Sequence, residues 1–211
     1  MKKNRIFKQI LLPYISILII LLFSGCSIIS LDKKEPEKKF YSFNQINSLQ
    51  QSIKSKTLLV TLVLMDFTST SEFNTDQFIY KKKNQYIKDY YNRFFLPPEK
   101  MIQTQCTEWL KNTDLFKKIS TESQLALSDF VLKGKLLEIY CDLTNSSASY
   151  AIIKIQFSLI KYDKTDKIVM QKDLYSRVEF KNFSSENLVN AWTKCLENIF
   201  QNLESEISSH I

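Results

Sequence analysis

The sequence predicts an α+β fold, a two-layer sandwich in which a mostly antiparallel sheet carries two main helices on one face. Several segments place apolar residues at every second position, which is typical of strands with one buried face. Two other segments repeat apolar residues at helical spacing. Along the chain the order is strands, helix, strands, helix, which favours α+β over a βαβ arrangement.

The first half predicts four strands and a helix. The expected strands cover residues 39–43, 57–67, 78–80 and 86–91. Pro98 suits the first turn of a helix, where its missing N–H is not needed, and Glu99 suits the positive helix N-terminus. We therefore expect a helix over residues 98–112, followed by a loop that leads to Ser128. Its buried face is expected to hold Ile102, Cys106, Trp109 and Leu110.

The second half predicts three long strands and a closing helix. The expected strands cover residues 129–143, 150–162 and 168–180, with a turn over 163–167. Gly134, inside the first of them, indicates a bulge or a close approach of another group. Ser184 or Ser185 is a candidate cap for the last helix. The apolar stripe of that helix comprises Leu188, Trp192, Leu196, Ile199, Leu203 and Ile207.

The N-terminus has the layout of a secretory signal peptide. A basic start is followed by an apolar run over residues 10–23, which is shorter than the roughly 20 residues of a membrane-spanning helix. The stretch "LFSGC", residues 22–26, resembles a bacterial lipobox. This resemblance implies cleavage before Cys26 and acylation of that cysteine. An uncleaved membrane anchor is the alternative.

These observations divide the chain into three parts. Residues 1–25 are the predicted lipoprotein signal peptide, and residues 26–38 contain the lipidated cysteine and a flexible tether. The tether is too polar and charged to bury a core. Residues 39–211 have the usual size of one domain. We therefore expect one folded domain held to a membrane by acyl chains, of which two or more are needed for stable attachment.

Composition argues against several classes of function. The formal net charge is +7, but it falls to +3 without the four basic residues of the signal peptide, and the remaining lysines are interspersed with acids. This pattern does not suit nucleic-acid binding. His210 is the single histidine, and after cleavage Gly134 is the single glycine. We therefore expect no catalytic site, no metal site and no cofactor.

Aromatic residues are densest between residues 86 and 95, in and just after the fourth predicted strand. The cluster comprises Tyr86, Tyr90, Tyr91, Phe94 and Phe95. One interpretation is a surface that contacts a partner or lipid, because interfaces favour aromatic residues. The other is that alternate members fill the core under the first helix. Tyr90 and Tyr91 are adjacent, so in a regular strand at least one of them is exposed.

Three cysteines follow the predicted cleavage site: Cys106, Cys141 and Cys195. Cys106 and Cys195 lie on or beside the apolar stripes of the two helices, so a disulfide between them is one hypothesis. The alternative is that all three are small buried residues with free thiols.

The order of elements resembles the ABC-type transport auxiliary lipoproteins, which accompany MCE-type lipid transport systems. The resemblance covers nearly the whole chain after the signal peptide. It rests on the lipobox and on five segments that follow it. They are "FYSF", "LLVTLVLMDF", "FIYKKKNQYIKDYYNRFF" before a proline-started helix, the strand "DFVLKGKLLEIYCD" with the hairpin after it, and the terminal helix "NLVNAWTKCLENIFQNLESEI". The family often has Trp where this chain has Phe94, and it has more Gly and Pro near the second strand.

This resemblance implies a non-enzymatic lipoprotein that docks on an MCE-domain protein with its ABC permease and ATPase. Such a protein helps to move phospholipid between the inner and outer membranes. The resemblance leaves open whether the domain itself binds phospholipid. Ser27, directly after the lipidated cysteine, suggests the periplasmic face of the outer membrane rather than the inner membrane. The alternative is a structural lipoprotein that links or assembles outer-membrane or cell-wall components. A secreted hydrolase or toxin is disfavoured by the residue inventory.

Overall fold

The computed structural model describes residues 36–46, 58–113, 115–121, 128–145, 147–162 and 166–211. The predicted signal peptide, Cys26 and most of the predicted tether lie outside these residues. The elements follow in the order β1 (Lys39–Tyr41), β2 (Leu58–Leu64), β3 (Thr68–Ser69), β4 (Gln77–Lys82), β5 (Gln85–Phe94), α2 (Pro98–Lys111), β6 (Phe116–Thr121), β7 (Phe130–Asp142), β8 (Ser149–Lys161), β9 (Lys167–Phe180) and α3 (Ser185–His210). The α+β class with two main helices is confirmed.

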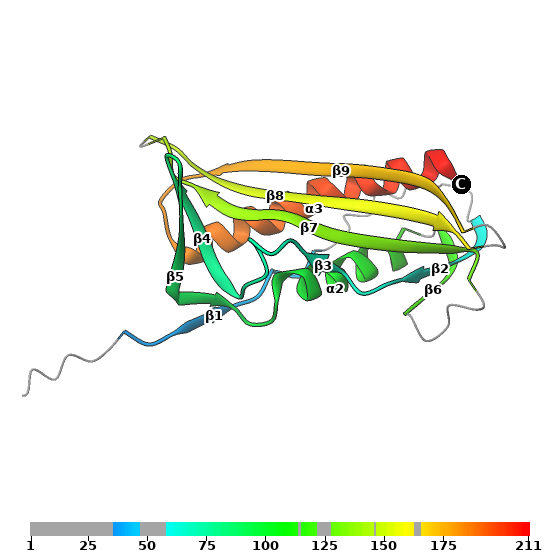
Figure 1. Ribbon diagram of the computed structural model, residues 1–211, viewed down its shortest axis with the longest axis horizontal. Coiled ribbons are helices and arrows are strands. Elements are labelled where there is room, and N and C mark those ends of the chain that lie inside the picture. The colour runs from blue at the N-terminus through cyan, green and yellow to red at the C-terminus, as the bar shows by residue number, and fades with distance from the viewer. Residues whose placement is uncertain (1–35, 47–57, 114, 122–127, 146, 163–165) are drawn as a thin grey trace, which may run out of the picture. The chain divides into compact units, whose positions relative to one another are not determined.

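The long strand β7 organises the sheet (Figure 1). On one side it pairs antiparallel with β8, which pairs antiparallel with β9. On its other side it pairs in succession with three short parallel strands, β2, β3 and β4. Beyond them the sheet continues from β2 to β6 and from β4 through β5 to β1. The parallel pairings are short, and the longest strands are antiparallel.

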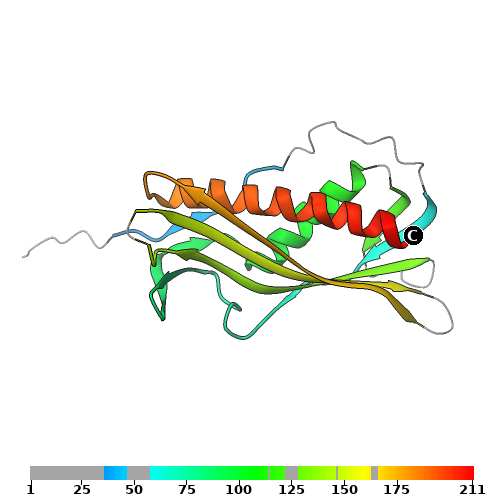
Figure 2. The same ribbon diagram turned by 90° about the horizontal axis from the view of Figure 1, so that it is seen from above.

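Both helices cover the same face of the sheet, as Figure 2 shows. Helix α2 begins with Pro98 and ends within one residue of the predicted position. Helix α3 is capped by Ser184, whose Oγ accepts a hydrogen bond of 3.1 Å from the backbone N–H of Asn187. The predicted apolar stripes of both helices are buried. No helix of the described residues covers the other face of β7, β8 and β9, and we call it the helix-free face.

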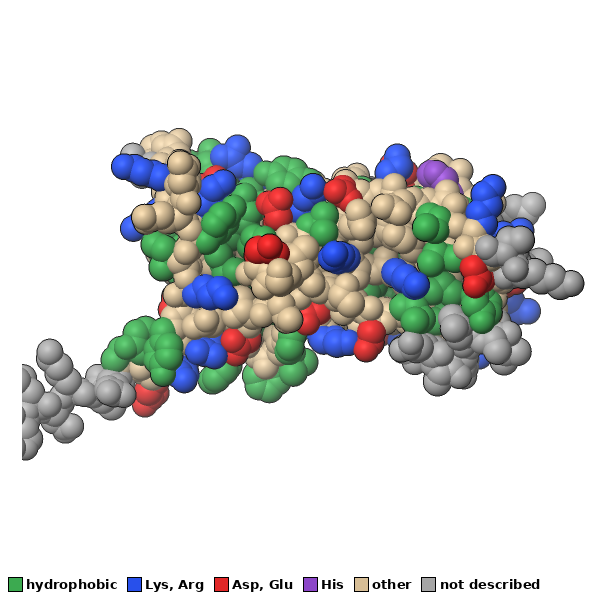
Figure 3. Space-filling model, in the orientation of Figure 1, with side chains coloured by type: hydrophobic (Ala, Val, Ile, Leu, Met, Phe, Trp, Pro, Cys, Tyr) green, Lys and Arg blue, Asp and Glu red, His purple; other side chains and the backbone are tan. Residues whose placement is uncertain are grey.

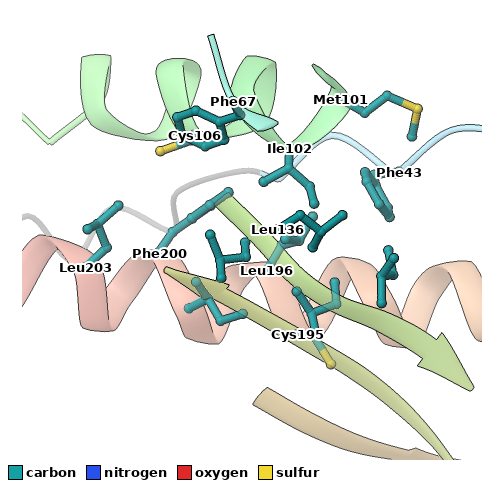
Figure 4. Close-up of a cluster of buried hydrophobic side chains, with 14 of the residues drawn as sticks. Phe43, Phe67, Met101, Ile102, Cys106, Leu136, Cys195, Leu196, Phe200 and Leu203 are labelled. Carbon is teal, nitrogen blue, oxygen red and sulfur yellow. The ribbon is translucent and has the colours of Figure 1, made fainter. Parts of the chain in front are cut away.

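The core lies between the helices and the sheet. Trp192 of α3 is fully buried and meets the rings of Phe78 and Phe94, with centroids 4.9 and 5.3 Å apart. Its indole N–H donates to the backbone carbonyl of Tyr140, with 3.3 Å between the nitrogen and oxygen. Figure 4 shows further members of this core from both helices and from the sheet. The core thereby joins α3 to β4, β5 and β7.

The strands β3 and β6 were not predicted. In β6 the pair Lys117 and Lys118 is exposed and interrupts the apolar pattern, so the segment was expected to be a loop. It forms a strand because Phe116 is buried and the segment pairs with β2. The predicted first strand, over residues 39–43, ends earlier, at Tyr41.

Candidate functional site

The five predicted interface aromatics do not form one cluster. Phe94 is buried, 2% exposed, against the core, so the interpretation as a partner-facing residue is wrong for Phe94. The other four are exposed, from 41% for Tyr91 to 69% for Phe95. The alternative, that alternate members fill the core, is therefore correct for Phe94 alone. Tyr86 lies apart from the others, on the helix-free side of the β4–β5 hairpin, where it pairs with Lys81.

A turn inside β5 explains why two adjacent tyrosines are both exposed. The register of β5 against β4 jumps, because Gln77 pairs with Arg93 whereas Ile79 pairs with Lys88. The extra residues of β5 therefore leave the regular alternation of a strand. This places both Tyr90 and Tyr91 at the surface.

Asp89 holds this turn. Its Oδ1 accepts hydrogen bonds from the backbone N–H groups of Tyr91 and Asn92, at 2.8 and 3.1 Å. Its Oδ2 accepts from Tyr80 Oη at 3.0 Å and from Asn92 Nδ2 at 2.6 Å. Burial raises the pKa of Asp89, but these hydrogen bonds outweigh it and hold the pKa below its ordinary value of 3.8. The Asp89 carboxylate thus faces the backbone of β5, while the rings of Tyr90 and Tyr91 are exposed to solvent.

The first candidate surface lies where β1 joins the second half of β5. Its exposed apolar side chains are Phe40, Tyr90, Tyr91, Phe95 and Leu96, and we call it the β1–β5 surface. Phe40 pairs with Arg93 across the two strands, on the side opposite to the core residues Tyr41 and Phe94. Figure 3 shows apolar side chains interspersed with charged ones at this end of the sheet.

Two cations flank Tyr90 in this surface. Lys38 Nζ lies 4.5 Å from the centre of the Tyr90 ring, and the Arg93 guanidinium lies 5.6 Å from it. Tyr91 meets Tyr90 edge-on, with ring centroids 5.2 Å apart. Arg93 also forms an ion pair of 3.1 Å with Asp76. The β1–β5 surface therefore combines apolar rings with positive charge, part of which Asp76 compensates.

The second candidate surface is the helix-free face. At one end, Phe73, Tyr86 and Tyr140 form an aromatic group with centroids 5.5 to 6.2 Å apart. Lys81 Nζ lies 5.6 Å from the rings of both tyrosines. Burial is the main cause of the raised pKa of the Tyr140 phenol, so this hydroxyl stays protonated at neutral pH.

Further along the helix-free face, aromatic and charged side chains alternate. The Arg177 guanidinium lies 3.5 Å from the centre of the Tyr150 ring, and Tyr175 on β9 is 51% exposed. Lys154 and Asp173 form an ion pair of 3.1 Å across β8 and β9. A shallow hollow of about 380 Å³ lies beside this region. Its lining comprises Met65, Asp66, Thr68, Lys133, Gly134, Lys135, Gln156 and Ser158.

Sequence reasoning missed several of these exposed residues. Phe40 was placed in a strand, but its exposure was not deduced, although it alternates with the core residue Tyr41. Tyr175 and Arg177 occupy outward positions of β9, which alternate with the buried Ser176. Applying the alternation to the outward residues of each strand would have found all three.

Of the two hypotheses for the cysteines, the structure supports buried free thiols and not a disulfide between Cys106 and Cys195. Both are free, buried thiols, and so is Cys141. Cys195 faces the sheet, where its Sγ lies 3.4 Å from the carbonyl oxygen of Ala151 and 3.7 Å from that of Ser176. Figure 4 shows Cys106 on the other helix, α2, and not beside Cys195. Both cysteines lie on apolar stripes, but these stripes meet different parts of the core.

The described residues contain no group of three or more His, Cys, Asp or Glu side chains that could hold a metal ion. None of their helices is long and apolar enough to cross a membrane. Asp66 binds Lys100 at 2.7 Å, and Glu72 accepts from Ser71 at 3.2 Å. Each of these carboxylates thus has a local partner.

Comparisons with known proteins identify the fold. No family model matches the chain, and no curated protein matches it. Protein XCC0632 from Xanthomonas campestris, described with the family model DUF330, superposes with a TM-score of 0.67 at 10% identity, covering 81% of this chain and 96% of that one. An uncharacterized protein superposes with a TM-score of 0.64 at 12% identity over 81% and 99% of the two chains. The hypothetical protein CT253 from Chlamydia trachomatis gives 0.53 at 8% identity over 72% and 98%.

Proposed function

We propose that this chain is an envelope lipoprotein that acts by docking. In this proposal Cys26 carries the lipid anchor, and the domain is the auxiliary component of an MCE/ABC-type phospholipid transport system. It performs no catalysis and holds its partner near the membrane. The observation that carries the proposal is the helix-free face, on which Tyr86, Tyr175 and Arg177 are exposed.

The residue types on this face suit protein docking. Tyr and Arg are enriched among the residues that contribute most binding energy at protein interfaces. Tyr150 and Arg177 already stack on each other, so little side-chain freedom is lost when a partner covers them. The ion pair between Lys154 and Asp173 lies in the same face and supplies polar groups of both signs. We propose that the MCE-domain protein, or the permease with its ATPase, contacts this face.

The sequence supports the location of the anchor. The lipobox and Ser27 suggest the periplasmic face of the outer membrane. The tether between Cys26 and β1 then allows the domain to reach a transport assembly that extends from the inner membrane. The proposal concerns docking and does not require phospholipid to pass over the domain itself.

The test is photocrosslinking in the native envelope. We would replace Tyr175, on the helix-free face, with a photoreactive phenylalanine analogue and identify the crosslinked proteins by mass spectrometry. Gln201, exposed on α3, is the matched control on the opposite side of the sheet. Crosslinking of an MCE-domain protein or its permease from Tyr175, and not from Gln201, is the expected result.

Other crosslinking results would contradict the proposal in different ways. Exclusive recovery of cell-wall or outer-membrane assembly proteins would support the structural lipoprotein instead. Equal crosslinking from Tyr175 and Gln201 would mean that the helix-free face has no special role. A detergent pull-down without crosslinking checks that the complex exists before irradiation.

A further inference from the structure

We propose that the β1–β5 surface lies in the interfacial region of the membrane to which the chain is anchored. This inference rests on the lipid anchor of the proposed function and adds a second, non-covalent contact with lipid. The surface is separate from the helix-free face around Tyr175, which the proposed function assigns to a protein partner. It would set the orientation of the domain on the membrane.

Position in the chain supports a membrane as the occupant. Twelve residues separate Cys26 from Lys39, the first residue of β1. A chain of this length spans about 45 Å at full extension and usually much less. β1 is the first element after Cys26 in the part of the chain that the structure describes. Phe40 lies in β1. Of the described strands, β1 is therefore joined to the anchor by the shortest length of chain, which keeps the β1–β5 surface near the bilayer.

The side chains fit the boundary between headgroups and acyl chains. Phe40, Phe95 and Leu96 are apolar throughout, whereas the tyrosines have an apolar ring and a polar hydroxyl. Aromatic rings with a polar end are enriched at membrane interfaces. Apolar side chains next to cations are the usual composition of segments that lie in the interface.

The charges also match a lipid surface. Lys38 and Arg93 lie at the ring of Tyr90. An anionic membrane attracts such cations to its surface. Asp76 is held by Arg93, and the carboxylate of Asp89 is turned toward backbone N–H groups, so neither presents a free acidic group at the centre of the surface.

Strand addition by a second copy is the main competing occupant. Within the part of the chain that the structure describes, β1 pairs with β5 alone, so its other edge is open. However, β1 has three residues, which limits the ladder that a further strand could form. The exposed groups are side chains on a face of the sheet, not backbone groups along its edge. They therefore suit contact with a lipid surface better than the addition of a strand.

The experiment uses the full acylated lipoprotein in vesicles of phosphatidylethanolamine and phosphatidylglycerol. An environment-sensitive NBD dye is attached in the variant Leu96→Cys, which leaves all four aromatic rings in place. Labelling is selective because Cys106, Cys141 and Cys195 are buried and Cys26 is acylated. The matched controls are Tyr175→Cys on the helix-free face and Gln201→Cys on α3, both exposed positions.

The expected result is a blue-shifted NBD emission at position 96. Lipids that carry a nitroxide on the upper acyl chain should also quench the dye at position 96 severalfold more strongly than the dye at position 175 or 201. Adding Tyr90→Ser and Phe95→Ser should remove most of this shift without changing the circular dichroism. Both residues are exposed, so the fold should tolerate these changes.

Separate results overturn the inference and the proposed function. If the protein floats with vesicles but position 96 is not quenched, the anchor stands and the membrane-contact inference is wrong. A blue shift without quenching by the lipid nitroxide would indicate a protein occupant, such as a second copy, and would also overturn the inference. If acylated protein fails to float with vesicles at all, the anchor of the proposed function fails first.

Discussion

The ring of Phe67 lies directly against the backbone of Gly134. A β-carbon added at Gly134 would come within 2.6 Å of Phe67 Cε2. The ring also meets Phe157, the cross-strand partner of Gly134, edge-on at 5.9 Å between centroids. The backbone N–H of Phe67 also donates to Gln103 Oε1 of α2, at 3.1 Å. This contact ties β7 to the segment between β2 and β3 and to the first helix.

Gly134→Ala should therefore destabilise the fold. The added methyl group forces Phe67 out of a packed position, and such overpacking costs about 1–3 kcal/mol. Denaturant unfolding of the purified domain measures the loss. Lys135→Ala, an exposed change on the same strand, is the control and should change the unfolding free energy little. An alanine variant as stable as the wild type would show that Phe67 moves aside without cost.

The fold could be predicted where one periodic pattern dominated. Helix α3 repeats its apolar stripe for many turns, and β8 alternates from Ala151 to Leu159, so their positions followed from the sequence. β6 could not be predicted, because two lysines interrupt its pattern and pairing with β2 decides its structure.

The candidate site was predictable only in part, for a similar reason. Alternation along β5 required one of Tyr90 and Tyr91 to face inward. The turn held by Asp89 breaks that alternation, and its hydrogen bonds join residues whose pairing no local pattern reveals. The disulfide hypothesis failed likewise, because a helical stripe shows that Cys195 faces the core but not which strands it meets.

Trp192→Ala should be among the most destabilising changes in the chain. Trp192 is fully buried between Phe78 and Phe94, and removing a buried Trp side chain costs about 3–5 kcal/mol. Thermal unfolding followed by circular dichroism at 222 nm, a standard helix signal, would measure it. Asn202→Ala, on the exposed side of the same helix, is the control. A loss no larger than that of the control would contradict the described core.

Ser184→Ala should weaken the start of α3. The hydroxyl of Ser184 caps the helix through the backbone N–H of Asn187, and loss of such a cap costs about 1 kcal/mol. Ser184→Asp keeps an acceptor oxygen at the same place and should retain most of the stability. Denaturant unfolding of both variants gives the comparison. Equal losses in the two would show that the hydroxyl is not the feature that matters.

The three buried thiols should be unreactive in the folded protein. Burial is the main cause of the raised pKa values of Cys141 and Cys195, each about 12, so almost no thiolate is present at neutral pH. A thiol reagent should therefore react slowly with the native protein. After denaturation without reductant it should detect Cys106, Cys141 and Cys195. Detection of one thiol in the unfolded protein would indicate a disulfide and contradict the free cysteines.

Asp89→Asn tests the turn in β5 through its pH dependence. The pKa of Asp89 is lowered in the folded protein, so the ionised carboxylate stabilises the fold above the unfolded pKa. This contribution is lost as the pH falls through the folded value, below 3.8. Asn keeps one acceptor oxygen but no charge, so at pH 7 the variant should be less stable, by about 1–3 kcal/mol for the weakened hydrogen bonds. The difference between wild type and variant should shrink as the pH approaches 3, because protonated Asp89 then resembles the neutral amide. Urea unfolding at a series of pH values measures this difference. If it is the same at pH 7 and pH 3, the charge of Asp89 does not hold the turn, and the exposure of Tyr90 and Tyr91 must depend on β5 packing instead.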